Sequence, residues 1–354
     1  MTSTHVTQAR LRDFIAEAMG KLGLPPDDAR IVATLMSEAD LQGSEGHGVF
    51  RLPQYARRIK AGGVNTRPNI RIVEERAGMA VIDGDNGMGQ LVMSRAAEIA
   101  ITKARITGIA WVGSRFSNHA GPASLYARMP LAHDMIGLYF AVGNANHLPP
   151  WGGIDMLLST NPIAAAFPAQ HEPAIVLDMA TTVAAYGKVK TKAQRGETMP
   201  EGWMVDRDGK PLTDPNRSDD GFLLPLGGME AGYKGFGLAL VIGLLAGTLN
   251  GAAMGKDVVD FNRDSHSVTN TGQAIMAIDL SAFGSIDMFK ARVDTLARDL
   301  RASQRMKNVE RITLPGDNSH ATRIANARDG IPMSPALLKE LDKVAADLSI
   351  AQLI

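Results

Sequence analysis

The chain has 354 residues, 45% of them hydrophobic, which is enough to bury a large core in one to three domains. Basic and acidic residues both number 37, and the formal net charge of zero argues against nucleic acid or an anionic membrane as a partner. The absence of cysteine excludes disulfides, thiolate nucleophiles and cysteine-based zinc sites. The first residues lack the apolar segment of a secretory signal, so we expect a cytoplasmic protein.

Three helices are predicted at the start of the chain. Apolar residues at helical spacing predict the first over residues 11–22. The second opens at Pro26 and stops at Gly43, and the third ends at Gly62. Residues 1–70 are therefore expected to form an N-terminal helical unit.

Strands and helices mix in the next part of the chain, residues 71–285, without a regular β-α-β alternation. Apolar runs predict strands at residues 70–75, 79–84, 108–114, 135–143, 162–169, 174–180 and 274–280. A helix is predicted at about 90–107 between two of them, and the Gly-, Pro- and Asp-rich residues 196–232 are expected to form an extended loop. This pattern indicates an α/β protein with a central mixed sheet, formed by residues 71–285.

An apolar helix is predicted after Gly235. Its run, residues 235–249, is shorter than the roughly 20 residues that a membrane span needs, so a buried core helix is expected. Residues 286–302 and 334–348 predict two amphipathic helices. We expect residues 286–354 to form a C-terminal helical segment that packs back on the N-terminal unit.

A glycine pair, Gly87 and Gly89, follows one predicted strand and precedes a helix, as in a Rossmann dinucleotide site. Such a site needs a third glycine and an acidic residue about 20 positions on. Val92 stands at the third glycine position, and the next strand is followed by Arg115. The sequence therefore argues against a Rossmann site.

His47, Arg51 and Tyr55 follow one another at intervals of four residues. In a helix that begins near His47 they would share one face. Arginine can hold a carboxylate through two parallel hydrogen bonds, and histidine can transfer a proton near neutral pH. The three residues are candidates for binding and protonating a 2-oxo acid, although a solvated helix face with the same residues is the alternative.

Two further segments carry candidate residues. His119 lies in a loop of small residues after a predicted strand, where a ligand could reach it or where it could be ordinary polar surface. Neither histidine has the partner spacing of a metal site, so proton transfer is the chemistry considered and no metal is expected. Lys234 lies between glycines at the predicted start of the apolar helix, a setting that suits an anion such as phosphate or an ordinary loop.

Taken together, these segments resemble the type-2 malate/L-lactate dehydrogenase family. The matching pieces include HGVFRLPQY, IDGDNGMGQ, SNHAG, STNPIAAAFP, VLDMATT, PEGW, GYKGFGLAL and LPGD, in family order over residues 40–333. The resemblance implies an NAD(P)-dependent oxidoreductase that interconverts a small 2-oxo acid and its 2-hydroxy acid. It also implies a non-Rossmann fold with a largely antiparallel sheet, and a homodimer with NAD or NADP at the subunit interface.

Residue roles also follow from the resemblance. It implies that His47 or His119 transfers the proton, and that Arg51 holds the substrate carboxylate. Tyr55 and Thr160 match substrate-binding positions. The positions that match cofactor-binding ones are His119, Asn144, Asp178, Met179, Ala180, Lys234, Leu314, Pro315 and Gly316.

The chain departs from the family pattern at two positions. Gly46 stands where many members have serine, and Lys188 stands where the imine-reducing branch has aspartate. Both departures favour an oxo acid over the alternative activity, a ketimine reductase acting on cyclic or N-alkyl imino acids. His147 lies in a run that differs from the usual one and is a candidate for a subfamily-specific contact or a structural role. A dimeric binding protein without catalysis is the alternative from another class.

Overall fold

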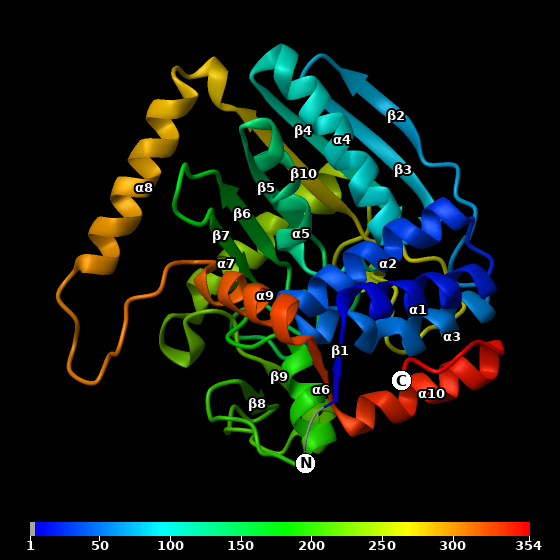
Figure 1. The fold of residues 1–354 in the computed structure, drawn as a ribbon. Helices are drawn as coiled ribbons and strands as arrows, with labels where there is room; N and C mark the ends of the chain where they lie inside the picture. Colours follow the sequence, from blue (N-terminus) through cyan, green and yellow to red (C-terminus); the bar gives the residue numbers. More distant parts are fainter. Residues whose placement is uncertain (1–3) are drawn as a thin grey trace.

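The structure is a computed structural model and describes residues 4–354 (Figure 1). A seven-stranded sheet with the order β2-β3-β4-β10-β5-β6-β7 forms its centre. The strands are β2 (Arg71–Arg76), β3 (Met79–Gly87), β4 (Ile109–Ser117), β5 (Met135–Ala141), β6 (Ile163–Phe167), β7 (Ile175–Met179) and β10 (Gln273–Asp279). Only the β3–β4 pair of this sheet is parallel, and the other five pairings are antiparallel. The prediction of a mixed, largely antiparallel sheet is confirmed.

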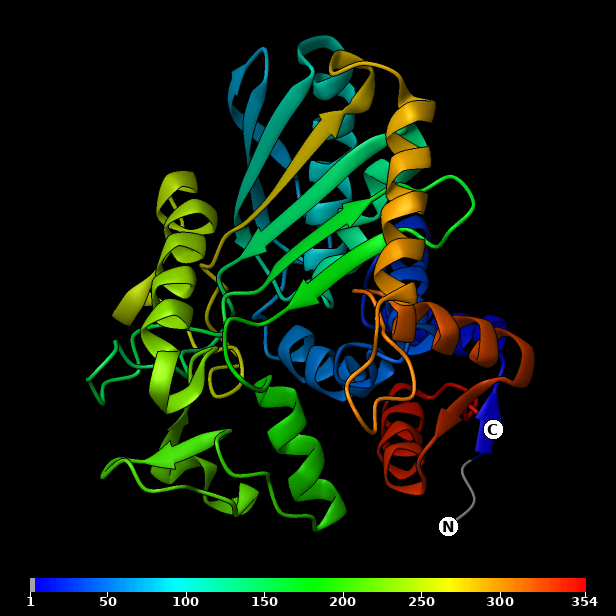
Figure 2. The same cartoon turned by 90° about the vertical axis from the view of Figure 1, so that its left-hand side faces the viewer.

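Helices cover both faces of this sheet because alternate strand residues are apolar on each side (Figure 2). On one face, α4 (Gly89–Thr107) and the short α5 (Ala123–Ala127) pack on Ile82, Val112 and Ile275. On the other face, α7 (Gly228–Ala246) packs on Phe140 and its neighbours. Two layers of helix therefore enclose the sheet, as an α/β fold requires.

A second core lies among the N-terminal helices. It contains α1 (Gln8–Lys21), α2 (Pro26–Leu41) and α3 (Leu52–Lys60), joined by α10 (Pro335–Leu348) from the other end of the chain. The N-terminal strand β1 (Thr4–Val6) pairs with β11 (Ile331–Met333), which precedes α10. Both ends of the chain therefore build the unit that carries the first candidate histidine (Figure 1).

The remaining C-terminal helices behave differently from one another. α9 (Asp317–Asp329) contacts α2, since Asn326 donates to the Leu41 carbonyl at 3.1 Å. α8 (Ile286–Ala302) lies at the periphery, and its buried Asp294 accepts hydrogen bonds from the backbone N–H groups of residues 170–172. α8 therefore packs on the turn between β6 and β7. The sequence had predicted that it would pack on the N-terminal unit. The predicted division into three segments stays a prediction.

Residues 196–232 contain more structure than the predicted loop. The short strands β8 (Met204–Asp206) and β9 (Gly221–Leu223) pair with each other, and α6 (Tyr186–Arg195) precedes them. Their apolar side chains form a separate small core that includes Val189, Met199, Met204, Leu212 and Leu223. The prediction missed these elements because turn-forming residues hide strands of only three residues.

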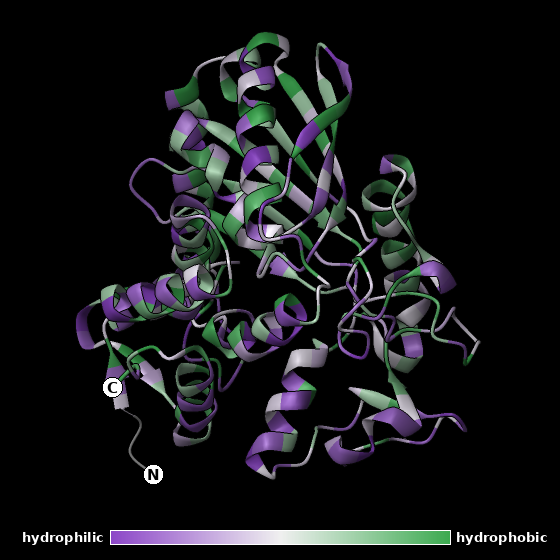
Figure 3. Cartoon of the chain, turned by 90° about the vertical axis from the view of Figure 1, so that its right-hand side faces the viewer, coloured by the Kyte–Doolittle hydropathy of each residue, from purple (hydrophilic) through white to green (hydrophobic). Residues whose placement is uncertain are grey.

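α7 is only partly buried, which corrects the prediction of a core helix. The segment Gly228–Asn250 is long and apolar enough to cross a membrane by length and composition, but one side of α7 packs on the sheet. Figure 3 colours the chain by residue hydropathy. The opposite side of α7 stays exposed, because Tyr233 is 53%, Leu240 37% and Leu244 46% accessible. The helix therefore presents an uncovered apolar face in the single chain.

The parallel β3–α4–β4 unit explains the glycine pair that resembles a Rossmann signature. A Cβ atom on Gly89 would lie 2.1 Å from the carbonyl oxygen of Asn118, in the loop that leads to His119. The glycine lets the start of α4 approach that loop closely. It thereby helps to position the second candidate histidine.

Candidate active site

His47 and Arg51 lie in two consecutive 3-10 turns, Glu45–His47 and Val49–Arg51, and α3 begins only at Leu52. The prediction that one helix carries His47, Arg51 and Tyr55 is therefore wrong. Gly48 separates the two turns in a non-helical conformation, with φ −91° and ψ −136°. The three side chains nevertheless lie together, through the folding of the turns and not through helical periodicity.

The buried carboxyl of Asp40, at the end of α2, holds these turns in place. Asp40 Oδ2 accepts a hydrogen bond from the Val49 N–H at 2.7 Å. A Cβ on Gly48 would come within 2.1 Å of the same carboxyl, so only glycine fits there. Burial raises the pKa of Asp40 to about 8, although the hydrogen bond from Val49 acts in the opposite direction and lowers it.

The raised pKa of Asp40 gives a testable dependence of stability on pH. A carboxyl whose pKa is higher in the folded state contributes stability that is fully present below its unfolded pKa of 3.8 and is lost as pH rises through about 8. Asp40→Asn keeps the acceptor for Val49 but cannot ionise. As pH rises from 5 to 8, we expect the free energy of unfolding of Asp40→Asn to increase relative to that of the wild type, by up to about 1.4 kcal/mol per pH unit. The thermal midpoint of the variant should rise relative to the wild type over the same range. Thermal unfolding of both proteins across this range checks it, and parallel pH curves would contradict it.

His119 lies in the loop between β4 and α5, and its ring is enclosed by aromatic neighbours. The His47 ring stacks on it with centroids 5.3 Å apart, and Phe261 stacks at 5.7 Å. The Tyr55 hydroxyl shares a hydrogen bond with His119 Nδ1 at 2.7 Å, and Gln90 Nε2 donates to the same hydroxyl at 3.4 Å. One ring nitrogen of His119 is therefore held by the protein, which leaves Nε2 as the nitrogen for a reacting group.

The surroundings of both imidazoles favour their neutral form. Burial, followed by the charge of Arg51, lowers the pKa of His47 to about 3. Burial, then the charges of Arg51 and His47, holds the pKa of His119 well below its usual range. Nδ1 of His47 is buried and has no hydrogen-bond partner among residues 4–354, in contrast to Nδ1 of His119. An anion beside Arg51 would offset part of the charge that keeps both rings neutral.

Arg51 is 9% accessible, and its guanidinium is only partly used by the protein. Nε donates to the Gly46 carbonyl and Nη1 to Gln54 Oε1, both at 2.8 Å. In the described part of the chain, Nη2 makes no hydrogen bond, and no carboxylate lies within ion-pair distance. A Cβ on Gly187, at the start of α6, would lie 3.9 Å from Nη2. The guanidinium therefore offers free donors to an acidic ligand.

Asn144 and Thr160 support the wall beside these rings. The Asn144 carbonyl accepts the Phe261 N–H at 2.8 Å, and its side chain donates to Thr271 at 2.6 Å. The Thr160 hydroxyl lies 3.4 Å from the position of a Cβ on Gly143, next to Asn144. Asn144 therefore contacts Phe261, whose ring stacks on His119, and Thr160 lies beside the neighbouring Gly143.

A second group of predicted residues lines a pocket of about 250 Å³ at the end of β7. Asp178 Oδ2 accepts the Ser124 N–H at 2.8 Å, and the Pro315 carbonyl accepts the Val176 N–H at 2.9 Å. The lining is Gln42, Ser124, Arg128, Val176, Leu177, Asp178, Pro315, Gly316 and Ser319. Ser124, on the short helix α5, follows the loop that carries His119. Met179 ends the same strand, and Ala180 follows it.

Arg128 in this pocket was missed from the sequence. Its Nε is buried without a hydrogen-bond partner in the described residues, and burial lowers the pKa of its guanidinium. An unused cationic donor opposite the Asp178 carboxylate suits a dinucleotide, whose phosphates need donors and whose ribose hydroxyls need acceptors. The signal in the sequence was one arginine within an otherwise apolar run, which resembles ordinary surface.

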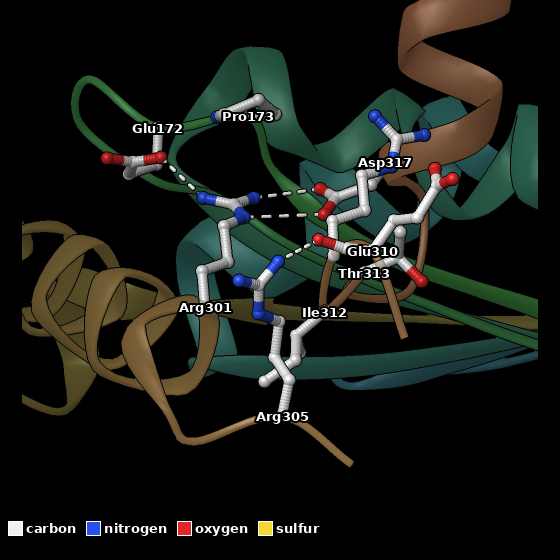
Figure 4. A pocket seen from close by; sticks show the side chains of 9 residues that line it. Glu172, Pro173, Arg301, Arg305, Glu310, Ile312, Thr313 and Asp317 are labelled. Atoms are coloured by element: carbon white, nitrogen blue, oxygen red, sulfur yellow. Dashed lines mark hydrogen bonds and ion pairs between the residues drawn. The ribbon is translucent and has the colours of Figure 1, made fainter. Parts of the chain in front are cut away.

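The loop at residues 314–316 is anchored from its far side by an ion-pair cluster (Figure 4). Arg301 donates to Asp317 at 2.8 Å and to Glu172 at 2.6 Å, at the edge of a pocket of about 480 Å³. Asp317 in turn accepts the Leu314 N–H at 2.8 Å. The cluster ties the end of α8 to the start of α9 and fixes the loop that lines the adjacent pocket.

Lys234 is the predicted residue that the single chain leaves apart. It is exposed on α7, just after a break in the helix at Ala231, and its Nζ lies 5.8 Å from the centroid of the Tyr233 ring. No hydrogen bond or ion pair joins it to either group described above within residues 4–354. Its predicted role stays a prediction.

The chain is similar to known proteins over nearly its whole length. Residues 6–342 match the family described as malate/L-lactate dehydrogenase. The malate dehydrogenase of Pyrococcus horikoshii is 39% identical to this chain, over 98% of this chain and 96% of its own length. A solved structure of malate dehydrogenase from Pyrococcus horikoshii superposes with a TM-score of 0.90, over 99% of this chain and 97% of that one. The L-sulfolactate dehydrogenase of Methanocaldococcus jannaschii is 36% identical over 96% of each chain. A Δ1-piperideine-2-carboxylate reductase from Pseudomonas syringae is 29% identical in its solved structure, with a TM-score of 0.84 over 97% of this chain and 100% of its own.

Proposed function

Because the chain belongs to the malate/L-lactate dehydrogenase family and is an oxidoreductase of 2-hydroxy acids, we propose that Arg51 binds the substrate carboxylate and His119 transfers the proton. The observation that carries the proposal is the free Nη2 edge of Arg51 beside the stacked histidine rings. A carboxylate held by two parallel hydrogen bonds fixes the adjacent C2 carbon in one orientation. The nicotinamide cofactor supplies the hydride acceptor or donor for that carbon.

His119 is favoured over His47 because a third group orients it. The Tyr55 hydroxyl can donate to His119 Nδ1 or accept from it, so the hydrogen bond at 2.7 Å supports either tautomer. Nε2 can then take the proton of the hydroxy acid or return it to the oxyanion of the oxo acid. The pKa of His119 lies below the usual range, so the ring is available in its neutral form. A neutral ring can accept the proton when the hydroxy acid is oxidised. His47, without such an orienting partner, contacts the His119 ring and the substrate.

The pocket at the end of β7 is proposed to hold part of the cofactor. Asp178 offers a carboxylate to ribose hydroxyls, and Arg128 offers a guanidinium to a phosphate. Gly316, in a left-handed conformation with φ 95°, lets the loop turn at the rim and leaves backbone donors open. Both NAD and NADP remain candidates for this pocket.

We also propose that the protein is a homodimer, with α7 in the interface. Tyr233, Leu240 and Leu244 share one face of α7 at spacings of seven and four residues, and all three are exposed in the single chain. Leu244→Glu places a charge within this face and is expected to convert the dimer to a monomer. Light scattering during size-exclusion chromatography measures the mass, with the exposed Lys256→Glu as a control. A wild-type monomer, or a Leu244→Glu dimer, would contradict the proposal.

Ketimine reduction is the second activity considered, because a reductase of that class is a structural neighbour. Serine and aspartate at the two positions noted in the sequence would form a relay with the histidine, but Gly46 and Lys188 occupy these positions here. Lys188 is exposed, and the Gly46 carbonyl is used by Arg51. The oxo-acid reaction is therefore the better supported of the two.

A panel of substrates tests the proposed reaction directly. Purified protein is assayed with NADH and with NADPH against pyruvate, oxaloacetate, 3-sulfopyruvate, pyruvate plus methylamine, and piperideine-2-carboxylate. We expect reduction of at least one 2-oxo acid and slower turnover of both imines. A protein that binds NADH or NADPH and oxidises neither with any of the acids would contradict the proposal and favour a binding role.

A further inference from the structure

A second cationic side chain lies beside Arg51, and no role has yet been given to it. Lys190, on α6, donates from Nζ to Asn262 Oδ1 at 3.0 Å. Gln54 donates to the same oxygen at 3.3 Å and accepts from Arg51 Nη1 at 2.8 Å. Two amide side chains therefore connect Arg51 and Lys190 in one continuous hydrogen-bonded row.

The positive charge in this row is not neutralised by the protein. Among residues 4–354, no carboxylate lies within 4 Å of Lys190 Nζ or of the Arg51 guanidinium, whereas Lys290, Arg301 and Arg323 pair with carboxylates. Asp260 and Asp219 act on Lys190 only from a greater distance. The hydrogen bonds through Gln54 and Asn262 hold the two cations near each other, and burial and then the charge of Arg51 lower the pKa of Lys190. Such an arrangement costs free energy unless an anionic ligand offsets it.

The surroundings of Lys190 extend the polar wall away from the histidine pair. Tyr186, one turn earlier on α6, lies with its ring 5.4 Å from Lys190 Nζ. The His147 ring stacks on Tyr186 with centroids 3.9 Å apart. Burial lowers the pKa of His147 to about 4, so this ring is neutral and can donate a hydrogen bond without adding charge. Arg51 and Lys190 thus mark two separate points at which acid groups can bind.

We propose that Lys190 binds a second acid group of the substrate, so that this chain acts on short 2-oxo and 2-hydroxy acids that carry an anion at both ends. The inference rests on the proposed function, in which Arg51 binds the carboxylate next to the reacting carbon. The distal group is a carboxylate or a sulfonate, both of which accept hydrogen bonds from an ammonium group. A substrate with a methyl group at that end leaves the charge of Lys190 unpaired and is bound less well.

The test compares dianionic and monoanionic substrates in three proteins. Oxaloacetate and 3-sulfopyruvate distinguish the two acid groups, and pyruvate is the monoanion. Lys190→Met removes the charge and keeps the length of the side chain, Lys190→Arg restores the charge, and Lys188→Met changes an exposed lysine on the same helix. We expect Lys190→Met to lower kcat/KM for the preferred dianion by about 10- to 100-fold, mainly through KM. Pyruvate kinetics should stay within about threefold, Lys190→Arg should recover most of the loss, and Lys188→Met should match the wild type.

Three results would overturn the inference. One is a wild type that reduces pyruvate as efficiently as both dianions. Another is an equal loss for pyruvate and the dianions in Lys190→Met, which would show a structural effect. The third comes from calorimetric titration of hydroxymalonate, a dianionic 2-hydroxy acid, which needs no turnover: equal affinity of wild type and Lys190→Met would overturn the proposal. If no 2-oxo acid is reduced but hydroxymalonate binding still depends on Lys190, the proposed reaction fails while the dianion site stands.

Discussion

His119→Ala is expected to lower kcat by about 10³-fold in both directions, because it removes the group that moves the proton to and from the substrate oxygen. The change in KM should be smaller, since Arg51 still holds the carboxylate. Steady-state kinetics at saturating cofactor measure both constants. Because the pKa of His119 is expected to rise when an anion binds beside Arg51, the pH profile of kcat for the wild type should contain a step that the variant lacks.

His47→Ala is the matched comparison, because this ring contacts His119 but has no orienting partner for its own Nδ1. We expect a loss of about tenfold in kcat, since the variant keeps the proton-transfer group but removes one side of its ring stack. Thermal unfolding should show that both variants are folded. A larger loss in His47→Ala than in His119→Ala would reverse the assignment of the proton donor, and full activity in both would refute it.

Arg51→Lys is expected to lower kcat/KM for the 2-oxo acid by about 10²-fold or more. Lysine keeps the positive charge but loses the planar pair of donors that fixes the carboxylate, and it cannot reach the Gly46 carbonyl and Gln54 at the same time. The loss should appear in KM through weaker binding and in kcat through poorer orientation of the reacting carbon. Initial rates over a range of substrate concentration separate the two constants.

Arg57→Lys is the control for this substitution, because Arg57 is an exposed arginine on α3, the helix that follows Arg51. Its kinetics should equal those of the wild type, since exposed substitutions away from specific contacts have small effects. Cofactor affinity, measured by fluorescence titration with NADH or NADPH, should be similar in all three proteins. Near-normal kinetics in Arg51→Lys would remove this guanidinium from substrate binding.

The regular elements of the fold were largely predictable, because apolar residues recur in the sequence with the period of the helix or strand whose face they bury. The strands of the central sheet and α8 were predicted within a few residues, since strands buried on both faces read as apolar runs. The exposure of α7 was not predictable, because a helix that is apolar on every side can pack against its own chain or against another chain. The short strands β8 and β9 are stabilised by a local core whose members are distant in sequence.

The candidate site was predictable in composition but not in construction. The spacing of His47, Arg51 and Tyr55 suggested a helix face, whereas a buried carboxyl and a glycine fold this segment into two tight turns. Which nitrogen of which histidine is held by the protein depends on Tyr55, whose contact with His119 spans 64 positions of sequence. Contacts of that kind leave no local signal, and Lys190 was missed for the same reason.

The pairing of the first strand with one near the end of the chain has a consequence for how the protein is made. Helix α10 and strand β11 complete the core around α1, α2 and α3, and both come from the last 24 residues. Ribosomal synthesis proceeds from the N-terminus and usually lets early segments fold first. Here the segment that carries His47 and Arg51 stays incompletely covered until residues 331–348 have been synthesised. A nascent chain arrested before β11 is synthesised should therefore expose apolar surface and need the help of chaperones.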